Sequence, residues 1–216
     1  MTSRGLLWLA LGALGLPLLV QGTGGCTFES PAPSVTPIDD NAYTCGCSCN
    51  AGSRSPTPFV VSASSDDAEQ DGAVVNLVDG DLDLGAEIVG LRFSGVALPP
   101  GAIIETAVVQ FRASENGTAP TDLQIVGLLG SDVPTFAAVN NDLSSRPATA
   151  TTIAWSPGPW TAGVAGVNER TPDLTALLQE LVDQPDWSTK SSVALRVQGT
   201  GQRAAVAFDA NANLTA

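Results

Sequence analysis

Short runs of alternating apolar and polar residues, separated by turns rich in glycine and proline, recur along most of this 216-residue chain. In the longest run, residues 102–113, Ala107 and Val109 alternate with Val108 and Gln110. A period of two is typical of a β-strand with one buried face. Similar runs cover residues 59–62, 73–78, 81–84, 87–93, 122–129, 149–155, 192–198 and 203–209. The chain is therefore predicted to be mainly β and to fold as a β-sandwich of the jelly-roll type.

One segment follows the period of a helix instead. Apolar residues recur there at positions i, i+3, i+4, i+7 and i+8, namely Leu174, Leu177, Leu178, Leu181 and Val182. Thr171 offers an N-cap, Pro172 suits the first helical position, and Asp173 places an acid in the first turn. Because Pro185 ends the segment, one short helix is predicted at residues 171–183.

The first 25 residues have the order of regions found in a secretory signal peptide. Arg4 provides a positive start, residues 6–20 are apolar, and small residues follow. The apolar run is shorter than the roughly 20 residues that span a membrane, and no later run comes close. We therefore expect export without a transmembrane segment in the mature chain. Residues 26–58 then form a Cys- and Pro-rich lead-in or linker, and residues 59–216 form the β-sandwich domain.

The four cysteines all lie in the lead-in, at Cys26, Cys45, Cys47 and Cys49. An even set in an exported protein predicts disulfides, here two bridges with three possible pairings. The Cys-x-Cys-x-Cys spacing does not fit a zinc site. Residues 23–26, Thr-Gly-Gly-Cys, loosely resemble a bacterial lipobox. A lipid anchor at Cys26 therefore stays an alternative to soluble secretion.

Composition excludes several kinds of chemistry. The chain has no histidine, and its nine Lys and Arg against 22 Asp and Glu give a formal net charge of −13 at pH 7. The lack of histidine excludes Ser-His-Asp and Cys-His catalysis and imidazole metal sites. The negative charge argues against nucleic acid as a partner, because binding it depends on Lys and Arg neutralising phosphates. The composition thus favours a non-catalytic protein with an acidic surface.

Acidic residues are concentrated between residues 66 and 83, in a predicted loop at 64–72 and in the next turn. Carboxylates and turn carbonyls are the ligands of calcium, which takes six to eight oxygens. The EF-hand spacing is absent. One interpretation is a structural calcium site, and the other is that Asp and Gly form turns whose acids are solvated. The candidate ligands are Asp66, Asp67, Glu69, Asp71, Asp79, Asp81 and Asp83.

Three tryptophans follow the leader, and each could pack in the core or bind a sugar face. Trp155 continues an alternating strand and is expected in the core. Trp187 follows the predicted helix and is expected to pack against it. Trp160 lies in a loop rich in Pro and Gly. It is the ring expected to be exposed and the candidate platform for a glycan, with packing against its own loop as the alternative.

Four arginines fall within predicted strands: Arg92, Arg112, Arg196 and Arg203. A guanidinium can pair with a uronate carboxylate through two hydrogen bonds, so Arg92 and Arg112 are candidate ligand-binding residues. The alternative is ordinary pairing with nearby acids on the solvent face.

An ordered series of short motifs extends over most of residues 59–209. It comprises Val-Gly-Leu-Arg-Phe at 89–93, Leu-Pro-Pro-Gly-Ala-Ile-Ile at 98–104, Ala-Val-Val-Gln-Phe at 107–111, Ile-Ala-Trp-Ser-Pro-Gly-Pro-Trp at 153–160, the segment from 173 to 187, and Gly-Thr-Gly-Gln-Arg-Ala at 199–204. The series resembles the DNRLRE-type jelly-roll modules of exported bacterial proteins, which include alginate-associated carbohydrate-binding modules. The resemblance implies a non-catalytic extracellular β-sandwich.

The resemblance also has a departure. Such modules end with a further strand after the position of residues 203–209, whereas here Asn-Ala-Asn-Leu-Thr-Ala follows. If the last strand is lacking, one sheet keeps an unpaired edge, unless the N-terminal region supplies the strand.

The leading hypothesis is a non-catalytic exported module, secreted or at the cell surface of a bacterium, that binds polysaccharide or extracellular matrix. The first alternative is a structural or adhesive surface protein without a small ligand. The second is a glycan-active enzyme that uses two carboxylates, for which Glu105, Glu115 and Glu169 are candidates. The sequence leaves the ligand and the oligomeric state open.

Overall fold

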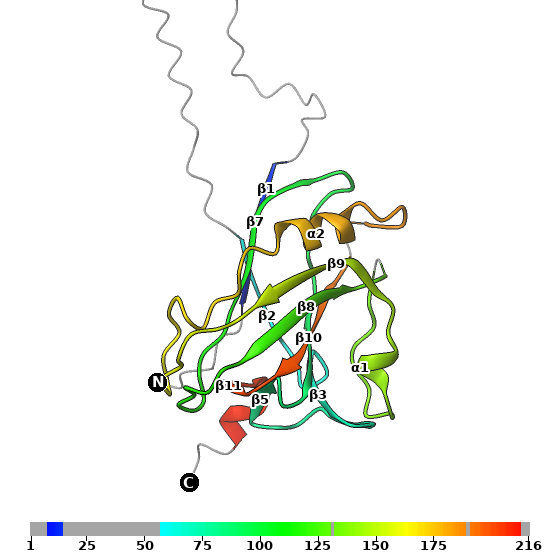
Figure 1. Ribbon diagram of the computed structural model, residues 1–216. Coiled ribbons are helices and arrows are strands. Elements are labelled where there is room, and N and C mark those ends of the chain that lie inside the picture. The colour runs from blue at the N-terminus through cyan, green and yellow to red at the C-terminus, as the bar shows by residue number, and fades with distance from the viewer. Residues whose placement is uncertain (1–7, 15–56, 131, 189–190, 213–216) are drawn as a thin grey trace, which may run out of the picture. The chain divides into compact units, whose positions relative to one another are not determined.

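The computed structural model describes residues 8–14, 57–130, 132–188 and 191–212 (Figure 1). The chain divides into two units, Met1–Leu16 with Ser55–Ala216 and Pro17–Arg54, and all described residues belong to the first. Its strands are β1 Trp8–Leu14, β2 Thr57–Val60, β3 Asp67–Asp71, β4 Val74–Asn76, β5 Asp81–Leu84, β6 Ile88–Phe93, β7 Ile103–Gln110, β8 Asp122–Leu128, β9 Ala148–Trp155, β10 Val193–Thr200 and β11 Arg203–Val206. The helices are α1 Asp142–Ser145, α2 Thr175–Val182 and the 3₁₀-helix η1 Phe208–Ala212. The prediction of a mainly β chain is confirmed.

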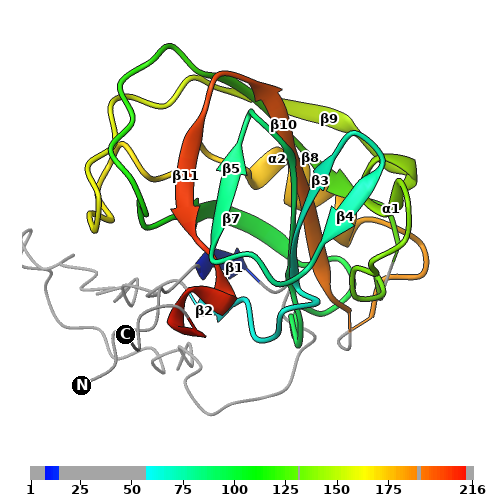
Figure 2. The same ribbon diagram turned by 90° about the horizontal axis from the view of Figure 1, so that it is seen from below.

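The largest sheet has six antiparallel strands in the order β4-β3-β6-β10-β8-β9. Strands β3, β4, β8, β9 and β10 of this sheet are labelled in Figure 2. At its centre Val197 of β10 lies in register with Val89 of β6 and Ile125 of β8. Two smaller antiparallel sheets accompany it, in the orders β2-β1-β7 and β11-β5.

The two faces of the six-stranded sheet bury different clusters. Because side chains alternate along a strand, Val197 points to one face and Gln198 to the other. The first face packs in the main core, which includes Phe93, Phe111 and Trp155. The second face carries a smaller cluster, Ala68, Val75, Leu128, Val133, Phe136, Leu143 and Ala194, under α1 and the preceding loop. The second face therefore has a covered part and an open part.

The predicted helix is shorter than expected. Its apolar stripe is confirmed, since Leu177, Leu178, Leu181 and Val182 are all buried. The predicted first turn is wrong, because α2 begins at Thr175. Among the described residues, no helix is long and apolar enough to cross a membrane.

The segment before α2 instead forms hydrogen bonds with the edge of β7. The Thr171 backbone N–H donates to the Val109 carbonyl, and the Thr171 hydroxyl accepts from the Val109 N–H, both at 3.0 Å. The Leu174 N–H donates to the Ala107 carbonyl at 2.7 Å. These contacts satisfy strand groups that would otherwise be unpaired, so Thr171 is a sheet partner rather than a helix cap.

Candidate functional site

An open groove of about 690 Å³ runs over the open part of the second face of the six-stranded sheet. Its floor is a single row of residues from five neighbouring strands. Gln70 of β3 lies in register with Ile88 of β6, Gln198 of β10 with Gln124 of β8, and Gln124 with Ala154 of β9. Val89 of β6 is in register with Val197 of β10, so the next residues along these strands, Ile88 and Gln198, also lie side by side. The row therefore continues from β3 and β6 to β10, β8 and β9.

Two amides in this row are available to a ligand. Among the described residues, neither the Gln124 nor the Gln198 side chain hydrogen-bonds another protein group. Gln124 is exposed and Gln198 is half-buried. Each amide offers two N–H donors and one carbonyl acceptor, and directly opposed residues on adjacent strands lie about 5 Å apart. The pair can therefore hydrogen-bond neighbouring polar groups of one molecule.

The end of the groove is polar and mildly acidic. Glu87 and Asp122 both line it, and the Ser156 hydroxyl donates to Asp122 at 2.6 Å. None of the described lining residues is basic or aromatic. The groove therefore suits a neutral ligand rich in hydroxyl groups better than an anion.

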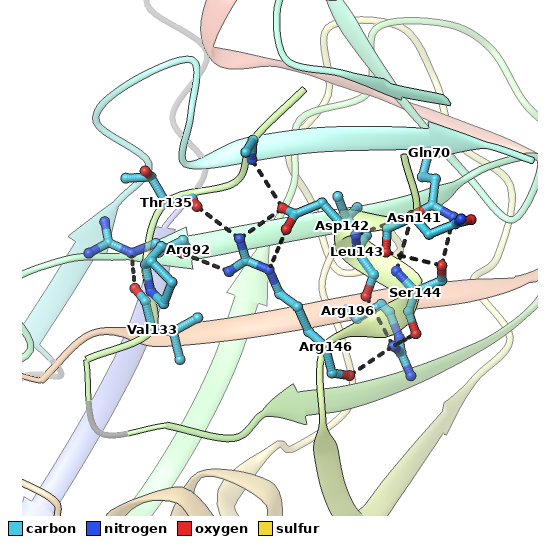
Figure 3. Close-up of polar contacts among 12 residues, drawn as sticks. Gln70, Arg92, Val133, Thr135, Asn141, Asp142, Leu143, Ser144, Arg146 and Arg196 are labelled. Carbon is cyan, nitrogen blue, oxygen red and sulfur yellow. Dashed lines mark hydrogen bonds and ion pairs between the residues drawn. The ribbon is translucent and has the colours of Figure 1, made fainter. Parts of the chain in front are cut away.

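Gln70 borders the groove but is fully engaged within the protein (Figure 3). Its Oε1 accepts the N–H groups of Leu143 at 3.1 Å and Ser144 at 3.0 Å, and its Nε2 donates to the Gly72 carbonyl and the Ser144 hydroxyl. The first N–H groups of a helix lack partners within the helix, and Asn141, the N-cap of α1, makes no side-chain cap bond. Gln70 thus replaces the missing cap and holds α1 on the sheet.

Arg196 fastens the other end of α1 (Figure 3). Its Nη1 donates to the carbonyls of Leu143 at 3.1 Å and Ser144 at 3.2 Å. Gly90 lies beneath this segment, and a Cβ added there would lie 2.7 Å from the Phe136 ring. A helix of only four residues is marginal by itself, so these side chains fix its position beside the groove.

Arg92, a predicted ligand-binding residue, is used inside the protein. Its Nη1 pairs with Asp66 at 2.7 Å and its Nε donates to the Val133 carbonyl at 2.6 Å, and only 12% of its side chain is exposed. Nearby, Arg146 binds Asp142 at 2.8 Å and the Thr135 carbonyl at 2.8 Å (Figure 3). Because both guanidinium groups hold the chain before α1, the prediction that Arg92 faces a ligand is not supported.

Arg112 is separated from the groove. It lines a different hollow of about 460 Å³ together with Asp81, Ser114 and Glu115, and the two sites share no lining residue. The structure therefore does not bring Arg112 together with Arg92 or with the row of amides.

The expectation that Trp160 is exposed is wrong. Only 1% of the residue is accessible, and its Nε1 donates to the Asn168 carbonyl at 2.8 Å. The ring centroid lies 6.0 Å from that of Phe111 and 6.2 Å from that of Trp155. The backbone of Trp160 also exchanges hydrogen bonds with Gly117, which draws the Pro- and Gly-rich loop inward. A ring so enclosed has no open face for a sugar. The expectation that Trp155 lies in the core is confirmed, and Trp187 is buried in the same core.

The acidic residues named as candidate calcium ligands lie in different surroundings. The predicted loop at 64–72 contains strand β3, in which Asp67 and Glu69 are buried. The Asp67 carboxylate accepts the Phe208 N–H at 2.7 Å, and Glu69 accepts the Asp83 N–H. Asp66 is paired with Arg92, while Asp71, Asp79, Asp81 and Asp83 are exposed or half-buried. Within the described ranges no group of three Asp, Glu, Cys or His side chains could hold a metal ion.

Burial changes the acid–base behaviour of the two strand carboxyls. It raises the pKa of Asp67 to about 7 and that of Glu69 to about 8, and the hydrogen bonds from Phe208 and Asp83 offset this only in part. Like charges add to the effect, from Asp209 at Asp67 and from Glu87 at Glu69. These carboxyls are structural groups at the junction of β3 with β5 and η1.

The sequence reasoning missed Gln124 and Gln198. The alternation in residues 122–129 does place Gln124 opposite to the buried Leu123 and Ile125. The pairing of β8 with β10 joins distant parts of the chain, and the alternating pattern does not reveal it.

The four cysteines lie outside the described residues. No family model, curated protein or solved structure matches this chain.

Replacing Gln70 with alanine is expected to lower the free energy of unfolding by about 2–3 kcal/mol. The substitution leaves the buried Leu143 N–H without a partner, and an unsatisfied buried group costs about 1–3 kcal/mol. Urea unfolding measures the change. Gln124→Ala is the matched control, because Gln124 lies in the same row without a bond, and we expect a change below about 0.5 kcal/mol. Equal effects of the two substitutions would show that Gln70 does not hold α1.

Proposed function

We propose that this protein is a non-catalytic, exported β-sandwich module of the jelly-roll type, similar to the DNRLRE-type modules, that binds a neutral polysaccharide. The observation that supports this function is the pair of unengaged amides, Gln124 and Gln198, on the floor of an open groove. The secreted or surface location rests on the predicted leader, and Cys26 offers a lipid anchor.

Sugar hydroxyls suit this groove because each hydroxyl both donates and accepts a hydrogen bond, as an amide side chain does. The Thr200 and Ser156 side chains at the end of the groove add further polar groups. The groove is open rather than enclosed, which suits an internal stretch of a long chain.

A neutral glycan is favoured over an acidic one. A uronate would meet Glu87 and Asp122 in the groove and a formal charge of −13 overall. Arg92 and Arg196, which could have offset this charge, are bound to internal partners. Alginate is therefore expected to bind more weakly than an uncharged polysaccharide.

The affinity for one chain segment is expected to be weak, at about millimolar Kd. A net hydrogen bond contributes about 0.5–1.5 kcal/mol, and the described groove residues offer no aromatic ring on which a sugar could stack. Three or four such bonds give about 4 kcal/mol, which corresponds to about 1 mM. Useful retention on a polymer would then depend on repeated sites.

Affinity electrophoresis in gels containing a neutral β-glucan, a galactomannan, a xylan or alginate tests the function. We expect retardation by at least one neutral polysaccharide, and at least tenfold weaker binding by the double variant Gln124→Ala with Gln198→Ala. Glu105→Ala, an exposed change outside the groove, should bind as the unaltered protein does. A folded protein that no neutral polysaccharide retards, or retardation that survives the double substitution, would refute the proposal.

A further inference from the structure

Strand β1 lies between β2 and β7 in an antiparallel sheet (Figure 1). Ala10 is in register with Pro58 on one side and Val108 on the other. Residues Trp8–Leu14 fall inside the segment for which the sequence predicts a cleavable signal peptide. The same residues thus have two roles that exclude each other in the mature protein.

The edge of β7 that faces β1 is held by β1 alone among the described residues. Successive residues of a strand direct their N–H and C=O groups to opposite edges. The groups of Ala107 and Val109 are occupied by Leu174 and Thr171. The groups of Thr106, Val108 and Gln110 therefore point to β1. Removing β1 would leave this edge without partners.

Strand β2 depends on β1 as well. Among the described residues it pairs with β1 alone, through four registered pairs from Trp8 with Val60 to Leu11 with Thr57. Because Ala10 directs its backbone groups to β7, the ring nitrogen of Pro58, which has no hydrogen to donate, faces away from β1. Proline at this position is compatible with an outer edge. Loss of β1 would detach β2 from the sheet.

The position of β1 also borders the main core. Ala107 and Val109 of β7 are 0% and 1% exposed and belong to that core. A strand placed beside β7 would need apolar residues at the positions opposite Ala107 and Val109. Closure by β2 alone is unfavourable, because it would have to move by about 4.8 Å, has only four residues and would lie parallel to β7.

We propose that the space between β2 and β7, the acceptor slot, takes up an extended apolar segment of another polypeptide once the leader has been removed. The incoming segment would run antiparallel to β7 and extend the sheet by main-chain hydrogen bonds, with apolar residues at alternate positions for specificity. The proposal rests on the predicted cleavage and is independent of the groove on the six-stranded sheet.

Hydrogen–deuterium exchange on the exported, processed chain tests the acceptor slot. The probe is a synthetic peptide with the sequence of residues 8–14 flanked by lysines. We expect fast exchange at the amides of Thr106, Val108 and Gln110 without the peptide, and at least tenfold slower exchange with it. The control peptide carries Ala10→Pro, which removes the N–H opposite Val108, and it should not slow the exchange.

Several results would overturn the proposal. The first is a folded chain in which the peptide does not change the exchange of the β7 amides. The second is an exported protein whose intact mass still includes residues 8–14. The third is a dimer, detected by light scattering, in which the β7 amides are already protected without the peptide. If the processed chain does not fold alone, it is refolded with each peptide. Folding with the first peptide only supports the proposal, and folding with neither overturns it.

Discussion

Replacing Trp160 with alanine is expected to lower the free energy of unfolding by about 4 kcal/mol, within the range of about 3–5 kcal/mol for buried tryptophan. The substitution removes a ring that is 1% exposed and packs with Phe111 and Trp155. It also leaves the Asn168 carbonyl without its donor. Chemical denaturation followed by circular dichroism measures the loss.

Trp160→Phe separates the two contributions. Phenylalanine keeps an aromatic ring in the core but has no N–H for Asn168, so a loss of about 1–2 kcal/mol is expected. Binding of polysaccharide by the folded fraction of either variant should be unchanged. If Trp160→Ala unfolds at the original denaturant concentration and only binding is lost, the ring acts on a ligand and the buried position is wrong.

The protein is expected to be more stable at pH 5 than at pH 8 by several kcal/mol. The pKa of Asp67 is raised to about 7 and that of Glu69 to about 8, mainly by burial, whereas both groups titrate near pH 4 when unfolded. Between about pH 4 and pH 8 the folded state therefore holds protons that the unfolded state has lost. Stability falls as the pH rises through this window, by about 1.4 kcal/mol for each unit of pKa difference.

Thermal unfolding at pH 5, 6, 7 and 8 measures this dependence, and we expect Tm to be at least about 10 °C higher at pH 5. Asp67→Asn with Glu69→Gln keeps an oxygen acceptor for Phe208 and Asp83 and removes the titration, so its Tm should vary much less with pH. Glu105→Gln, at an exposed position, should retain the full dependence. A pH-independent Tm in the unaltered protein would contradict the burial of two carboxyls.

Alternating sequence patterns anticipated which residues are buried within a strand. Leu123 and Ile125 are buried and Gln124 is exposed, as the period of two predicts. The apolar stripe of α2 was predicted equally well, because it too is a local repeat. The first residue of α2 was predicted wrongly. The Thr171 hydroxyl can accept a hydrogen bond from the N-terminus of a helix or from the edge of a strand, and here it accepts one from Val109 of β7.

Polar side chains near the predicted sites were assigned less well. An arginine can bind a ligand carboxylate, an internal acid or a backbone carbonyl, and only the fold shows that Arg92 binds Asp66 and Val133. An acidic run such as residues 66–71 predicts an exposed loop, because charged residues are rarely buried. Strand β3 is an exception, because its two buried carboxyl groups accept hydrogen bonds from backbone N–H groups. Asp83 donates to Glu69, and Phe208 donates to Asp67.

The sequence by itself determined the mainly β class, the apolar stripe of α2 and the exclusion of histidine chemistry, because each depends on composition or on neighbours along the chain. Only the tertiary structure decided that Trp160 is buried, that Gln124 meets Gln198 in a groove, and that Trp8–Leu14 lies between β2 and β7. These features arise from pairing between distant strands, and the register of such pairing is fixed by the packing of the whole sheet rather than by any local pattern.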